Sequence, residues 1–124
     1  MSPSLSDPRG ESMPRHSYSV GVSNQRLFGM VHEAASDGHF ALTLGGDHCI
    51  AIGSLSGALA VRPQLGVIWV DAHADINAPG FSPSSNAHGM PVAFLTKMVE
   101  YVVPLPLVWV PIITHHARWV VWCG

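Results

Sequence analysis

Apolar residues recur at helical spacing in the first regular stretch of the chain. The positions that form one stripe are Leu27, Met30, Val31, Ala34 and Ala35. They follow one another at i, i+3, i+4, i+7 and i+8, which places them on one face of a helix. Ser23 or Asn24 can cap the start of this helix, and Gly38 suits a left-handed end. The pattern predicts an amphipathic helix between these residues.

Two short apolar runs flank a second helical segment. The run "FALTL" (40–44) predicts a short buried strand, and "GVIWV" (66–70) predicts a second strand. No polar residue interrupts 66–70, as is typical of a strand covered on both faces. Between the two runs, "CIAIGSLSGALAV" (49–61) predicts a helix, which Gly53 and Gly57 weaken because glycine has a low helix propensity.

A strand, a helix and a second strand joined by short connections predict a βαβ unit with parallel strands. The carboxyl ends of parallel strands lie at the same edge of a sheet, where open α/β sheets bind their ligands. The first strand leads into "GGDH" and the second into "DAHAD". We therefore expect His48 to lie near Asp71, His73 and Asp75 at that edge.

The remaining segments divide the chain into three parts. Residues 1–19 are rich in Ser, Pro and Arg and predict a disordered lead-in. Residues 20–101 form the expected α/β domain; it includes the loop "NAPGFSPSSNAHG" and a third helix, "MPVAFLTKMVEY" (90–101), with Pro91 in its first turn. Residues 102–124 form a divergent tail rich in Val, Pro and Trp, in which "ARWVVW" is compatible with a strand.

Composition and charge narrow the possible functions. Apolar residues make up 48% of the chain and charged residues 11%, so the sheet is either buried on both faces or lacks covering elements. A formal net charge of −2 with only six Lys and Arg argues against nucleic acid as a partner. The apolar stretch 102–113 is too short and contains too many prolines to span a membrane. The N-terminus has no apolar signal segment, so we expect a soluble, cytoplasmic protein.

The segment "DAHADIN" (71–77) contains the candidate metal ligands. In an extended chain Asp71, His73 and Asp75 share one side. Together with His48 they form a set of oxygen and nitrogen ligands that favours Mn²⁺, Mg²⁺ or Fe²⁺ over structural zinc. A pair of such ions can share a water and convert it to hydroxide. The alternative is that the aspartates only cap helices or turns, but four such residues at one edge favour a metal site.

His88 lies in the loop "NAHG" that follows the second strand. If this loop folds over the metal site, the imidazole could transfer a proton. If it does not, His88 is a solvated loop residue, which is the usual place of a histidine in such a loop.

Two stretches resemble a known family. With "TLGGDHCIAIGSLSGALAVRPQLGVIWVDAHADIN" followed by "NAHGMPVAFL", the chain resembles arginases, of the ureohydrolase family, over about residues 20–97. The resemblance implies a three-layer α/β/α fold with a parallel sheet, of which this chain holds a truncated N-terminal part. It also implies hydrolysis of L-arginine to L-ornithine and urea by a hydroxide that bridges two manganese ions.

The resemblance also implies roles for individual residues. His48 and Asp75 resemble ligands of the first manganese, His73 a ligand of the second, and Asp71 the bridging ligand. Asp75 and His88 are then catalytic positions, with His88 as the proton shuttle. The positions that resemble those binding the α-carboxylate and α-amino ends of arginine are Asn77, Ser84 and Asn86.

The chain departs from the family pattern in three ways. Cys49 stands where Ser is usual. Ser85 stands where the family loop typically has Gly. The later Asp-x-Asp motif and a further glutamate, which complete the family's metal site, are absent from these 124 residues. Two carboxylates do not balance two divalent ions, and uncompensated buried charge is unfavourable. We therefore expect one ion, or weak binding, and little or no turnover.

Two alternative functions remain. Another ureohydrolase such as agmatinase is one, although Asn77 favours a substrate that carries an α-carboxylate, as L-arginine does. The other is a non-catalytic fragment that binds a metal or associates with a full-length relative or with a second copy of itself. Substrate profiling separates the first alternative from arginase, and manganese titration tests the metal binding that the second allows.

Overall fold

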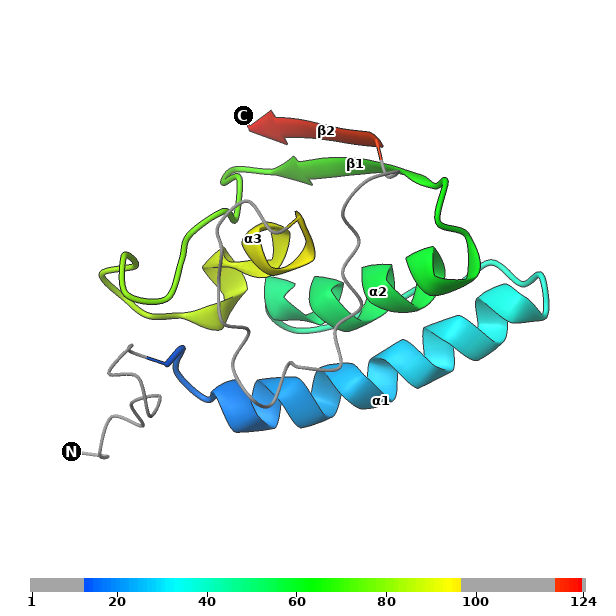
Figure 1. The fold of residues 1–124 in the computed structure, drawn as a ribbon, viewed down its shortest axis with the longest axis horizontal. Helices are drawn as coiled ribbons and strands as arrows, with labels where there is room; N and C mark the ends of the chain where they lie inside the picture. The colour runs from blue at the N-terminus through cyan, green and yellow to red at the C-terminus, as the bar shows by residue number, and fades with distance from the viewer. Residues whose placement is uncertain (1–12, 97–117, 124) are drawn as a thin grey trace.

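The computed structural model describes residues 13–96 and 118–123. Two parallel strands form one layer, and α2 and α3 lie beneath them, with α1 on the far side of α2 (Figure 1). The elements in chain order are α1 (Ser17–Ser36), the 3-10 helix η1 (His48–Ile50), α2 (Ala51–Val61), β1 (Gly66–Asp71), the 3-10 helix η2 (Ala87–Gly89), α3 (Pro91–Thr96) and β2 (Arg118–Cys123). The predicted α/β class and parallel sheet are confirmed. Within the described residues, however, the helices lie on one side of the sheet only.

The sheet consists of β1 and β2, which pair in parallel from Gly66 with Arg118 to Asp71 with Cys123. The strand pattern of "ARWVVW" is thus confirmed. Along β1, Trp69 is buried against the helices, whereas Ile68 and Val70 on the opposite face are 76% and 72% exposed. The prediction that this strand is covered on both faces is wrong for the part of the chain that the structure describes.

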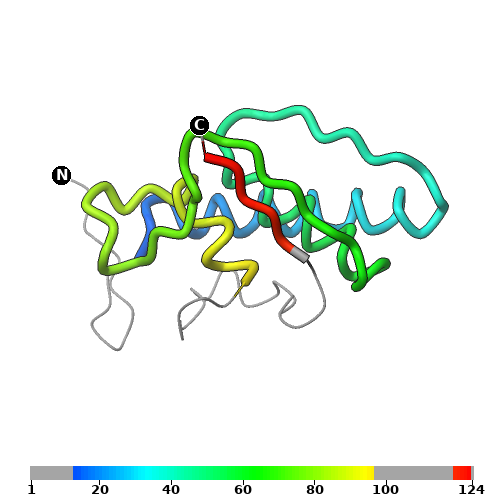
Figure 2. Tube along the Cα trace, turned by 90° about the horizontal axis from the view of Figure 1, so that it is seen from above, coloured from blue at the N-terminus to red at the C-terminus, as the bar shows by residue number. Residues whose placement is uncertain are grey.

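The predicted strand at 40–44 does not form. Residues 39–45 have no regular secondary structure, and Phe40, Leu42 and Leu44 are largely exposed. Figure 2 shows this segment running separately from both strands of the sheet. A strand requires a hydrogen-bonded neighbour, and among the described residues the neighbour of β1 is β2. The apolar run 40–44 is present, but the βαβ pairing inferred from it is wrong for the described residues.

Helix α1 begins earlier than its apolar stripe indicated. It starts at Ser17, after His16 in the left-handed conformation (φ 56°), and not at a capping Ser23. The predicted lead-in therefore ends before residue 17, and residues 1–12 lie outside the described part. Gly38, with φ 78°, ends the helical turn as predicted. Met30 of the stripe is 68% exposed because α1 packs on one side only, against α2 and η1.

The two glycines of α2 allow the helices to approach closely. A Cβ atom at Gly53 would lie 2.4 Å from the backbone oxygen of Asn24, and one at Gly57 would lie 2.7 Å from that of Phe28. Glycine is unfavourable within a helix, but at these two positions it permits backbone contact between α1 and α2. The residues that form the main core cluster beside this contact are Cys49, Ile52, Ala87, Met90, Phe94 and Leu95.

Helix α3 starts at Pro91, as predicted, and its described part ends at Thr96. The rest of the predicted helix (97–101) and most of the tail (102–117 and 124) lie outside the described residues. No helix in the described part is long and apolar enough to cross a membrane. Cys49 and Cys123 are both free thiols.

Candidate metal centre

Three side chains meet at the carboxyl end of β1. His48 is the first residue of η1, Asp71 is the last residue of β1, and Asp75 follows four positions later. The Nδ1 atom of His48 lies 2.5 Å from Oδ2 of Asp71 and 3.1 Å from Oδ2 of Asp75. One ligand atom from each residue lies within 4.8 Å of the others. The predicted convergence of these three residues is confirmed, and we call them the trio.

Two contacts fix the position of His48. The side chain of Asp47 accepts a hydrogen bond from the backbone N–H of Cys49 at 2.9 Å, which caps the start of η1. The imidazole stacks on the indole ring of Trp69, with ring centroids 4.2 Å apart. Sequence reasoning missed this role of Trp69. The available signal was its place two residues before Asp71, which puts both side chains on one face of the strand.

Asp75 reaches the trio through a turn of the backbone. Its φ of 51° lies in the left-handed region, which aspartate tolerates better than most residues. Its carbonyl oxygen accepts hydrogen bonds from the N–H groups of Val92 and Ala93 at the start of α3. The side chain is 6% exposed, and its burial and the nearby charge of Asp71 raise its pKa. The interior thus disfavours the charged carboxylate.

Asp71 has the opposite environment. Its Oδ1 atom accepts a hydrogen bond from the N–H of His73 at 3.0 Å, which contributes most to lowering its pKa. Its Oδ2 atom faces His48, and the hydrogen bond to that ring and its charge lower the pKa further. The two carboxyl groups therefore differ: Asp71 is stabilised as an anion by the protein, and Asp75 is not.

The trio suits a divalent cation. Oδ2 of Asp75 is buried and accepts no hydrogen bond from the described residues. Nδ1 of His48 lies near it but carries at most one proton, and Oδ2 of Asp71 is the closer acceptor. A buried carboxylate oxygen without a donor is either protonated or paired with a cation, and the ligand atoms of His48 and Asp71 beside it favour a cation. Ligands about 2.1 Å from one ion lie at most about 4.2 Å apart, so atoms that lie within 4.8 Å of one another need only a small adjustment to bind one ion.

His73 does not join the trio. Its side chain is 83% exposed, and its Nδ1 atom lies 3.7 Å from Oδ1 of Asp71. The alternation argument placed His73 with Asp71 and Asp75, but β1 ends at Asp71 and the chain bends at residues 72–73. The period of an extended strand therefore no longer applies to His73.

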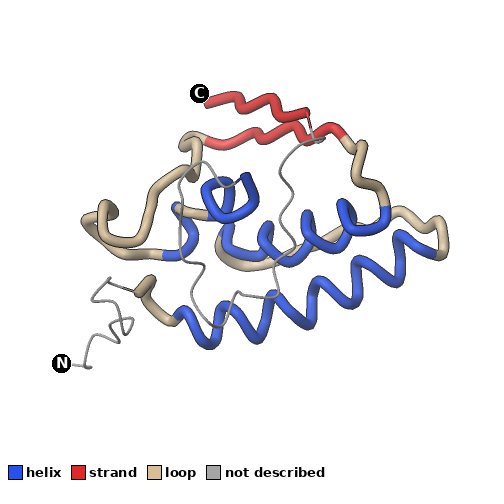
Figure 3. The backbone as a smooth tube through the Cα atoms, in the orientation of Figure 1, coloured by secondary structure: helices blue, strands red, loops and turns tan. Residues whose placement is uncertain are grey.

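The loop after the trio returns to the same end of the sheet (Figure 3). The backbone N–H of Asn77 donates to the carbonyl of Gly89 at 3.0 Å, which ties the two ends of the loop together. Ser84 accepts a hydrogen bond through Oγ from the N–H of Asn86 at 3.3 Å. Ser85 adopts a left-handed φ of 54°, a conformation that glycine reaches with less strain.

His88 lies on η2 and is exposed. It is close enough to contribute to lowering the pKa of Asp47 and to oppose the raised pKa of Asp75. It lines a cavity of about 200 Å³ with Asn86, which was also predicted from the sequence. The other lining residues, which sequence reasoning did not identify, are Arg15, His16, Val20, Asp47 and Ala87. His88 and Asn86 therefore line one cavity, together with Asp47, the residue before His48.

The sequence is similar to proteins of one family. Residues 10–116 match the profile described as "Arginase family". The arginase of Emericella nidulans is 56% identical over 97 residues, which cover 74% of this chain and 29% of that protein. Human arginase-1 is 52% identical over 86 residues, which cover 69% of this chain and 27% of that protein. The chain thus spans less than a third of the length of these relatives.

The fold is similar to solved arginase structures. The arginase of Bacillus caldovelox matches with a TM-score of 0.75 and 37% identity over 93% of this chain and 38% of that one. The arginase of Entamoeba histolytica in complex with L-ornithine matches with a TM-score of 0.69 and 26% identity, over 98% of this chain and 43% of that one.

Proposed function

Because the chain belongs to the arginase family, we propose that it serves the hydrolysis of L-arginine to L-ornithine and urea. The observation that supports this most is the trio, in which three ligand atoms lie within 4.8 Å at the end of a parallel strand. Because the chain spans under a third of its curated relatives, the reaction is a proposal for this chain. The L-ornithine complex of the Entamoeba histolytica enzyme is compatible with it.

The trio would hold the first metal ion, which we propose to be Mn²⁺. Asp71 directs Oδ2 toward His48 and Oδ1 toward His73, so its two oxygens face two different imidazoles. This arrangement supports a bridging role for Asp71 and makes His73 a candidate ligand of a second ion. When bound, such an ion lowers the pKa of a coordinated water toward neutrality and so supplies the nucleophile.

The loop residues would bind and protonate the substrate. Asn77, Ser84 and Asn86 lie on the loop that follows the trio, and their polar side chains could hold the amino-acid end of arginine. As the C–O bond to water forms and the C–N bond to ornithine breaks, the leaving amine requires a proton. His88 is exposed beside the cavity and could deliver that proton.

Urea release with added Mn²⁺ tests the proposed reaction. We expect slow, Mn²⁺-dependent release from L-arginine and less from agmatine, because agmatine lacks the carboxylate that Asn77 would bind. Asp71→Asn serves as the matched control, since it removes the charge and keeps the shape. Release that is equal in Asp71→Asn and wild type, or that favours agmatine, would contradict the proposal.

A further inference from the structure

A buried asparagine joins α1 to the first turn of α2. Asn24 is only 2% exposed, and its Oδ1 atom accepts a hydrogen bond from the backbone N–H of Gly53 at 2.7 Å. Its Nδ2 atom donates to the carbonyl of Val20 on its own helix at 3.0 Å. Both ends of the amide are therefore used, which fixes its orientation.

This hydrogen bond acts as a helix cap supplied by another helix. Gly53 is the third residue of α2, in the first turn, where backbone N–H groups are often satisfied by side-chain acceptors. Ile50, at the capping position, makes no side-chain cap hydrogen bond. A Cβ atom at Gly53 would lie 2.4 Å from the backbone oxygen of Asn24, so the contact depends on glycine.

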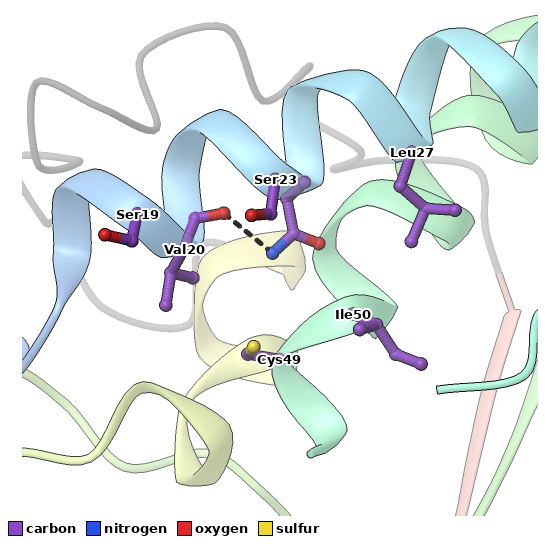
Figure 4. Close-up of a pocket in the computed structure, with 7 residues that line it drawn as sticks. Ser19, Val20, Ser23, Leu27, Cys49 and Ile50 are labelled. Atoms are coloured by element: carbon purple, nitrogen blue, oxygen red, sulfur yellow. Dashed lines mark hydrogen bonds between the residues drawn. The ribbon is translucent and has the colours of Figure 1, made fainter. Parts of the chain in front are cut away.

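The capped turn is continuous with the turn that carries His48. Helix η1 runs directly into α2, and the N–H of Ala51 donates to the carbonyls of His48 and Cys49. In Figure 4, Val20 and Leu27 of α1 lie on the side that faces Cys49 and Ile50 of η1. A shift of α2 relative to α1 would therefore move the backbone that holds the imidazole.

We propose that Asn24 is a positioning residue for the metal centre. By capping α2 from α1, it fixes η1, keeps the imidazole of His48 stacked on Trp69, and so maintains the geometry of the trio. The effect on metal affinity rests on the proposed metal site, but the effect on the ring of His48 exists without metal.

Asn24→Leu removes the acceptor and the donor while keeping the branched shape and number of heavy atoms of the side chain. The matched control is Val31→Ala, which weakens the same α1–α2 contact beside Gly57 and leaves the cap intact. In metal-free protein, we expect Asn24→Leu to lose amide-exchange protection at Gly53 and the NMR contacts between the His48 and Trp69 rings. Val31→Ala should keep both.

Calorimetric titration with Mn²⁺, at a temperature where each variant is folded, gives the second readout. Asn24→Leu should lower the affinity about tenfold, as loss of an outer-shell partner typically does. Asn24→Asp keeps the acceptor oxygen, and because burial favours the neutral carboxyl, its O–H can replace the donor to the Val20 carbonyl; this variant should keep the ring contacts and most of the affinity. Its results also test the proposal if Asn24→Leu does not fold.

Three results would overturn the proposal: intact His48–Trp69 contacts in folded Asn24→Leu, their loss in folded Asn24→Asp, or equal loss in Val31→Ala. A wild-type chain that binds no Mn²⁺ would instead contradict the proposed metal site. The contacts between the His48 and Trp69 rings, measured without metal, distinguish a failure of the Asn24 proposal from a failure of the proposed metal site.

Discussion

The trio and the two neighbouring histidines, His73 and His88, differ in what holds them in place. His48 is fixed by a capped turn and a stacked indole ring, and Asp75 is held by two hydrogen bonds from α3 to its carbonyl. His73, by contrast, is 83% exposed and follows the end of β1, and His88 is exposed on a short 3-10 helix. The trio is held by contacts with packed elements, whereas the side chains of His73 and His88 are exposed.

This difference indicates that one ion site is assembled before any ion binds. Preassembled ligands lose little conformational entropy on binding, whereas exposed side chains must be ordered first. We therefore expect the trio to determine the affinity for the first ion and the outer histidines to contribute little to it. The following substitutions test that ranking.

Asp75→Asn should have the largest effect. It removes a buried ligand charge, and we expect Mn²⁺ affinity to fall by more than about 100-fold, beyond the loss typical of an outer-shell change. Burial raises the pKa of Asp75 above its unfolded value, so its stabilising contribution is present at low pH and lost as pH rises through the folded pKa. The metal-free variant should therefore be at least as stable as wild type at neutral pH.

Titration calorimetry and chemical denaturation of Asp75→Asn measure both effects. An affinity within a few-fold of wild type would show that Asp75 is not a ligand. A less stable metal-free variant would show that the buried carboxylate does not carry the expected penalty.

Trp69→Leu should have an intermediate effect. The indole is 4% exposed and lies against the imidazole of His48, so its loss frees that ring to rotate. We expect about a tenfold loss of Mn²⁺ affinity. Trp69→Phe keeps a flat ring and should lose less. If both variants bind equally weakly, core disruption explains the loss and stacking does not.

His73→Ala should have a small effect on the first ion. An exposed charged pair contributes at most about 1 kcal/mol, so the affinity should change by no more than about fivefold. Asp71→Asn is the comparison, because it removes the partner that His73 shares with the trio. A loss as large as that of Asp71→Asn would place His73 inside the first site and contradict the ranking.

His88→Ala should leave Mn²⁺ affinity unchanged. It lies outside the trio and acts, in our proposal, on the substrate's leaving group. The rate of Mn²⁺-dependent urea release should fall by about 100-fold or more, as for loss of a general acid. His39→Ala, at an exposed histidine just beyond α1, is the matched control and should leave both quantities unchanged.

The sequence predicted the parts of this molecule that depend on local pattern. The apolar run 66–70 became β1, Pro91 began α3, and Gly38 ended the turn after α1. The trio followed from two motifs at the ends of expected strands, even though one of those strands did not form. His48 lies near Asp71 because η1 begins at His48 and the side chain of Asp47 caps it. Both Asp47 and His48 belong to the motif "GGDH".

The remaining features depend on contacts between distant segments. The sequence pattern predicted that 40–44 forms a strand paired with 66–70. In the described residues, 66–71 pairs with β2 instead. It also left His73 with the trio, because the turn at which the N–H of His73 donates to the side chain of Asp71 was not recognised in "DAHAD". The use of Asn24 as a cap for α2 is likewise visible only once α1 and α2 are packed together.

Titration of the metal-free wild-type chain with Mn²⁺, followed by calorimetry and by the EPR signal of free Mn²⁺, tests the central claim most directly. A preassembled trio predicts saturable binding of one ion per chain, with any second ion bound much more weakly. The absence of saturable binding, or two ions bound with equal affinity, would contradict the claim that His48, Asp71 and Asp75 form one preassembled site.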